Sequence, residues 1–193
     1  MTGKTVILCE GRHDLIFLSL LLERAGRKFL PKNWDQICGR SEISGERRVI
    51  QDFLRTRERS SVLIKQDNNR DTCINHFWMI YGYADERYSL KMVLDSDNGI
   101  TLRNLKEEML CATQKDLLNR DSACGFSLKT EEESGIFLYP TTLTESVFEV
   151  TGKNLNNFHE GDSQRKVLEE FLEEEVEWVG ELKEFLFGRT SFT

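Results

Sequence analysis

The sequence has few of the features that mark a fibrous, disordered or membrane-spanning protein. Two prolines in 193 residues, without a low-complexity tract, argue against a disordered or fibrous chain. No run approaches the roughly 18 to 20 apolar residues that a membrane span needs. Near the N-terminus, Glu10 and Asp14 interrupt what would be the apolar part of a signal peptide. We therefore expect a cytoplasmic protein that has no membrane partner.

Cysteine and positive charge are also limited. Five cysteines form an odd and scattered set without a CxxC pair or a histidine at ligand spacing, which argues against a disulfide framework and a structural zinc site. Buried reduced thiols are the simpler interpretation. A net charge of -7 gives no general attraction for nucleic acid. It does not exclude such a partner, because acids at a metal site are neutralised locally by the metal.

Apolar runs of strand type alternate with segments of helical periodicity, and this alternation predicts the fold class. We expect an α/β protein with a mainly parallel sheet, flanked by helices on both faces. Strands are predicted at 5–9, in "KFLP" or "DQIC" within 28–38, at 61–66, 90–94, 125–129 and 135–140. Helices are predicted at 13–25, 44–59, 73–84 and 101–118, from near Thr144, and as one long helix from Ser163 to Phe187.

Two of the apolar strands end in carboxylates followed by glycine. "VILCEG" leads into Glu10 and Gly11, and "KMVLDSDNG" leads into the pair Asp95 and Asp97 and then Gly99. Parallel strands bring such ends to one sheet edge, where the sites of open α/β sheets form. Residues i and i+2 of an extended chain point to the same side, so the two aspartates can reach one ion. An all-oxygen set of this kind suits Mg²⁺ or Mn²⁺.

These two motifs resemble those of the Toprim domain, which topoisomerases, primases, recombination proteins and overcoming-lysogenization-defect nucleases share. "EGRHD" after the first strand and "DSDNG" after a later one carry the resemblance, over roughly residues 4 to 150. It implies that Glu10 binds metal or acts as a general acid or base, and that Asp95 and Asp97 bind metal. The nuclease branch places a second acid at the position of Asp14. It also places an acid near a later helix start, where this chain offers Glu145.

The chain departs from the topoisomerase and primase patterns. Topoisomerases usually carry a further aspartate where this sequence has Gly99, and there is no room for a separate tyrosine-bearing domain or a cysteine-rich zinc module. The separation between Glu10 and Asp95 allows an extra strand and helix at about 61–88. The expected organisation is therefore a Toprim-like domain over 1–152, similar to stand-alone Toprim-like proteins, with a helical extension over 153–193 packed on it.

Several of these residues also have simpler interpretations. Asp14 and Glu145 can each serve only the first turn of a helix, where the dipole favours a negative charge. Gly11 and Gly99 are expected to let the backbone turn tightly and a substrate approach. A basic surface for nucleic acid is predicted from four arginines, which can equally be solvated helix residues. They are Arg12, Arg47, Arg48 and Arg55.

We expect divalent-metal-dependent phosphodiester chemistry on DNA or RNA, most plausibly that of a Toprim-type nuclease. In this hypothesis the carboxylates hold Mg²⁺ or Mn²⁺, and Glu10 or Asp14 assists proton transfer. The alternative is a scaffold without catalysis, which binds nucleic acid or protein and works with a partner in repair, recombination or RNA processing. Because no second domain selects a substrate, a protein partner is expected to do so.

Overall fold

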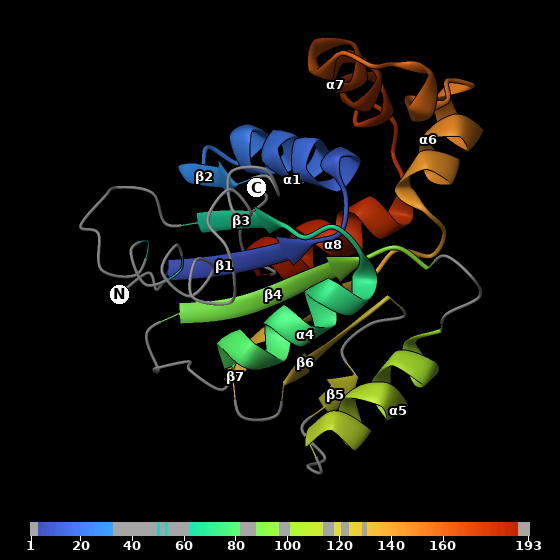
Figure 1. Cartoon of the computed structure of the whole chain (residues 1–193). Helices are drawn as coiled ribbons and strands as arrows, with labels where there is room; N and C mark the ends of the chain where they lie inside the picture. Colours follow the sequence, from blue (N-terminus) through green and yellow to red (C-terminus); the bar gives the residue numbers. More distant parts are fainter. Residues whose placement is uncertain are drawn as a thin grey trace. The chain divides into compact units, whose positions relative to one another are not determined.

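The computed structural model of the chain describes residues 4–32, 50, 53, 62–81, 88–96, 101–113, 118–120, 124–128 and 131–188. The chain forms two compact units, Met1–Met92 and Val93–Thr193. Figure 1 shows their helices and strands.

The first unit is built on parallel strands. It contains β1 (Lys4–Cys9), β2 (Phe29–Lys32), β3 (Val62–Gln66) and most of β4 (Tyr88–Leu94). β3 lies between β1 and β2 and runs parallel to both, with Cys9 opposite Gln66, and β4 lies on the other side of β1. β1, β3 and β4 are almost wholly buried, because their apolar side chains form the centre of the core.

Two helices cover opposite faces of this parallel sheet (Figure 1). α1 (Arg12–Arg24) packs on β2 and β3, whereas α4 (Arg70–Tyr81) packs on β1. The chain crosses from β1 past β3 to β2, and later from β3 past β1 to β4, which is the opposite direction. Right-handed connections therefore place α1 and α4 on different faces. The predicted α/β class with a mainly parallel sheet is confirmed.

α1 ends as its sequence predicts. Gly26 has φ +64°, a left-handed conformation that favours glycine, and the Arg27 N–H donates to the Leu22 carbonyl at 2.9 Å. β2 is the "KFLP" alternative of the weak strand. Of the predicted helix at 44–59, only residues 50 and 53 fall in the described part of the chain, and both are helical.

The second unit combines an antiparallel hairpin with several helices. α5 (Leu102–Thr113) precedes β5 (Leu118–Arg120), β6 (Gly125–Leu128) and β7 (Glu131–Leu138), which pair antiparallel in the order β5-β6-β7. The end of β4 lies beside β7, and the Tyr139 N–H donates to the Leu94 carbonyl at 2.9 Å. α6 (Leu143–Thr151), η2 (Leu155–Asn157), α7 (Gly161–Phe171) and α8 (Glu177–Phe187) complete the unit.

Two predicted boundaries in this unit are wrong. The long helix expected from Ser163 to Phe187 is interrupted between α7 and α8, where Val176 is extended with φ -99° and ψ 119°. Glu173 and Glu174 lie in the gap, four residues after Glu169 and Glu170, and like charges at this spacing repel in a continuous helix. β7 begins at Glu131 and includes acidic residues that were expected to separate two strands, because pairing with β6 outweighs their low strand propensity.

Across the described ranges, no helix is both long enough and apolar enough to span a membrane.

Candidate functional site

The first predicted carboxylates lie where β1 gives way to α1. Glu10 directly follows β1 and is half-buried, and Gly11 is the N-cap of α1. The φ of Gly11 is -120°, which any residue adopts, but an added Cβ would meet Asp14 Oδ2 at 3.3 Å. The missing side chain thus allows the Asp14 carboxylate to approach the backbone closely.

Asp14 is buried, with 3% of its surface exposed, and lies in the first turn of α1. The Gly11 N–H donates to Asp14 Oδ2 at 2.8 Å. A carboxylate at this point satisfies an N-terminal amide and interacts favourably with the helix dipole. The structural interpretation of Asp14 is therefore observed, and its role at a metal site stays a prediction.

The pKa of the Cys9 thiol depends on the charges around this strand end. Burial raises the pKa of the Cys9 thiol well above its usual range, and the carboxylates of Asp14, Asp67 and Glu10 raise it further. Lys65 acts in the opposite direction but less strongly than the two aspartates. The end of β1 is therefore an acidic environment to which three different segments contribute.

In the second unit, the start of α6 brings two other predicted acids together. The Leu143 N–H donates to Asp95 Oδ1 at 3.0 Å, and the preceding Thr142 N–H donates to Glu145 Oε2 at 3.1 Å. Adjacent backbone amides thus bind one oxygen each from Asp95, directly after β4, and from Glu145. The Glu145 N–H in turn donates to the Thr142 hydroxyl oxygen at 3.1 Å, which completes an N-terminal capping box.

The other predicted site residues are less informative. Arg12 is exposed on the first turn of α1. Burial, followed by the charge of Arg12, lowers the pKa of the neighbouring His13. The remaining predicted site residues lie outside the described part of the chain: Asp97, Gly99, Arg47, Arg48 and Arg55.

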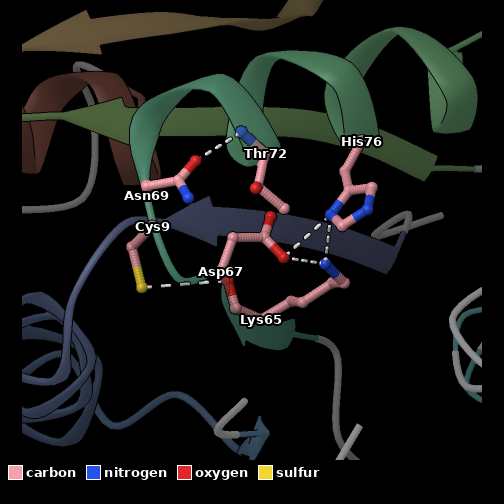
Figure 2. A network of polar contacts seen from close by, with 6 residues as sticks. All are labelled: Cys9, Lys65, Asp67, Asn69, Thr72 and His76. Carbon is pink, nitrogen blue, oxygen red and sulfur yellow. Dashed lines mark hydrogen bonds and ion pairs between the residues drawn. The ribbon is translucent and has the colours of Figure 1, made fainter. Parts of the chain in front are cut away.

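The structure adds a buried charged cluster that the sequence analysis missed (Figure 2). It consists of Lys65 on β3, Asp67 just after β3 and His76 on α4. Lys65 Nζ and Asp67 Oδ1 form an ion pair, and both side chains are 0% exposed. His76 Nδ1 lies 2.9 Å from the same Oδ1 and 2.8 Å from Lys65 Nζ, with 15% of its side chain exposed. We call these residues the Lys65–Asp67–His76 cluster.

Two proton arrangements fit the Lys65–Asp67–His76 cluster. If His76 Nδ1 carries a hydrogen, it donates to Asp67, and if it does not, it accepts from the Lys65 ammonium. In both arrangements Lys65 pairs with Asp67 Oδ1. The other oxygen, Asp67 Oδ2, is buried and has no hydrogen-bond partner among the residues that the structure describes.

The acids fit a divalent cation by their chemistry. Carboxylate oxygens suit Mg²⁺ and Mn²⁺, and Glu10 and Asp95 each directly follow a strand. Among the residues that the structure describes, which do not include Asp97, no group of three His, Cys, Asp or Glu side chains is close enough to hold a metal directly.

Comparison with known proteins does not identify a family for this chain. No family model matches the sequence, and no significant match was found among curated proteins or solved structures.

Proposed function

We propose that this chain is a Toprim-type nuclease, an enzyme of divalent-metal-dependent phosphodiester chemistry on DNA or RNA. One observation carries the proposal: Glu10 directly follows β1, and Asp95 directly follows β4. Carboxyl ends of strands are where α/β sheets form their sites. Both strands are buried, so the acids occupy their ends rather than a solvated face.

The proposed roles of Glu10, Asp95 and Asp97 follow from the surroundings of each side chain. Glu10 is half-exposed, so it can meet a ligand or exchange a proton. Asp95 is fixed by the Leu143 N–H, which keeps its carboxylate at the end of β4. Asp97 is the proposed second aspartate of the metal-binding pair. When Mg²⁺ or Mn²⁺ is bound by these acids, it supplies an activated water and stabilises negative charge on phosphate.

Two further residues are assigned roles beside Glu10, one in contact with a nucleic acid and one in proton transfer. Arg12 is exposed two residues after Glu10, where it can pair with a phosphate. Asp14 is close enough to the strand end to affect the Cys9 thiol, and we propose that it supports Glu10 in proton transfer.

A scaffold without catalysis is the second candidate. It is favoured by the hydrogen bonds of Asp14 and Glu145, since each acid already serves a helix start. In that case the chain would bind nucleic acid or a protein partner without cutting, and a partner would supply any catalysis.

A cleavage assay separates the two candidates. The purified chain is incubated with single- and double-stranded DNA and RNA in Mg²⁺ or Mn²⁺, together with Glu10→Gln and Asp95→Asn. Glu149→Gln and Asp71→Asn are the matched controls, because both acids are exposed on helices, Asp71 with 78% of its side chain.

Cutting that needs the metal, stops in Glu10→Gln and Asp95→Asn and continues in both controls supports the nuclease. Binding of nucleic acid without cutting supports the scaffold. If calorimetry detects no divalent-ion binding at millimolar concentration, the proposed metal site is wrong.

A further inference from the structure

Asp67 lies at the same sheet edge as Glu10, although it comes from another strand. The register of β1 and β3 pairs Cys9 with Gln66, so Glu10 and Asp67 are the next residues on each strand. The Asp67 N–H donates to the Cys9 carbonyl at 2.7 Å, which extends the pairing past the end of β3. The backbone of Asp67 is therefore bonded to the peptide that leads into Glu10.

This position is a topological switch point. β1 and β3 are neighbours, but the chain leaves β1 toward α1 on one face and leaves β3 toward α4 on the other. In open α/β sheets, ligands bind in the crevice that such diverging connections leave at the carboxyl ends of the strands. Asp67 begins one of the two connections, and Glu10 begins the other.

The two oxygens of the Asp67 carboxylate differ in their hydrogen-bond partners. Oδ1 contacts both Lys65 and His76, whereas Oδ2 is buried and meets no hydrogen-bond donor within the described part of the chain. Buried carboxylate oxygens normally have at least one donor, which a bound water or another ligand can supply. Figure 2 shows the carboxylate beneath the first turn of α4, where Asn69 accepts from the Thr72 N–H at 2.9 Å.

We propose that Asp67 is a further carboxylate of the cation site proposed at Glu10, and that its Oδ2 accepts a hydrogen bond from a water bound to the cation. Mg²⁺ gives up its waters reluctantly, so the carboxylates around it often act through them. The charge of Asp67 raises the pKa of the Cys9 thiol, as do the charges of Asp14 and Glu10.

The inference rests on the proposed function, and the strength of metal binding tests it without an activity measurement. Groups that hold the ligands of a metal typically contribute about 10- to 100-fold to its affinity. We expect Asp67→Asn to weaken Mn²⁺ binding by about 10-fold, measured by isothermal titration calorimetry on the full chain.

Asp71→Asn is the matched control, because it removes an equal charge from an exposed position on α4. Lys65→Met/Asp67→Asn removes both partners of the buried ion pair, so it tests Asp67 without leaving an unpaired buried ammonium. Circular dichroism on every sample establishes that the variants are folded.

The outcomes separate the two proposals. Weaker Mn²⁺ binding in Asp67→Asn, or in the double variant if the single one does not fold, supports the role of Asp67. If the wild type binds Mn²⁺, Glu10→Gln abolishes binding, and the folded Asp67 variants bind as tightly as Asp71→Asn, the inference is wrong but the metal site stands. If the wild type binds no Mn²⁺, both proposals are wrong.

Discussion

Removing one charge from the Lys65–Asp67–His76 cluster should destabilise the chain far more than its single ion pair suggests. Lys65 and Asp67 are both 0% exposed. Lys65→Met leaves the Asp67 carboxylate without its cation in the protein interior. Breaking a buried pair in this way typically costs about 3–5 kcal/mol, a large part of the roughly 5–15 kcal/mol that stabilises a protein.

The double variant Lys65→Met/Asp67→Asn should behave differently. Both charges are removed together, so no uncompensated ion stays buried, and such replacements are often close to neutral. The loss in the double variant should therefore be smaller than the sum of the single losses by about 3 kcal/mol or more. A shortfall of that size measures the coupling between the two side chains.

Urea denaturation, followed by circular dichroism and by tryptophan fluorescence, measures these free energies of unfolding. Trp78 on α4 reports on the unit that contains the cluster. Lys153→Met is the matched control, because it breaks an exposed pair with Glu170 whose side chains are 42% and 55% exposed. Pairs of that kind contribute at most about 1 kcal/mol.

The reasoning is refuted if Lys65→Met costs no more than Lys153→Met. It is also refuted if the two single losses simply add up in the double variant. Should a single variant fail to fold, the double variant must recover a cooperative transition.

Three other predictions concern protonation and capping. Burial and the charge of Arg12 lower the pKa of His13 below its usual 6.5. The contribution of neutral His13 to stability is therefore complete above pH 6.5 and is lost as pH falls toward the lowered pKa. His13→Asn should flatten this decline, measured as the urea midpoint at each pH. Burial raises the pKa of the half-buried Cys124 to about 11. Iodoacetamide should therefore label Cys124 slowly at pH 8 and faster near pH 11. The buried thiol of Cys9 should stay unlabelled. Thr142→Ala should destabilise the chain by about 1 kcal/mol, because the N-cap of α6 is lost. Glu145→Gln should keep the capping box, and it should lose cleavage only if Glu145 binds metal.

Each of these has a clear contrary result. An unchanged pH dependence in His13→Asn would remove His13 as its source. Labelling of Cys9 at the rate of the urea-unfolded chain would contradict its burial. A Glu145→Gln variant as unstable as Thr142→Ala would show that Gln does not replace Glu in the cap.

The sheet and its helices were predictable because they depend on local pattern. Apolar β-branched runs gave β1 and β3, and the glycine after α1 gave its end. The ends of β7 and the interruption between α7 and α8 were not predictable in the same way. The first depends on pairing with β6, and the second on competition between helix propensity and the repulsion of neighbouring glutamates.

The candidate site was predictable in part. The positions of Glu10 and Asp95 after their strands follow directly from the sequence pattern. The Lys65–Asp67–His76 cluster does not, because the polar stretch after β3 indicates a solvated turn, whereas the structure buries Asp67 completely. The available signal was a lysine inside an apolar strand with an aspartate two residues later, which places both on one face.

The hydrogen bond between the Leu143 N–H and Asp95 Oδ1 joins residues that are 48 positions apart. The Tyr139 N–H and the Leu94 carbonyl make a second link beside it. The segment that contains α5 and the hairpin therefore begins and ends at nearly one point of the second unit. Residues inserted into this segment leave its two ends in place, because loop closure costs little more as a loop grows. This makes it the natural position for grafting a foreign module or a cleavable linker onto the chain.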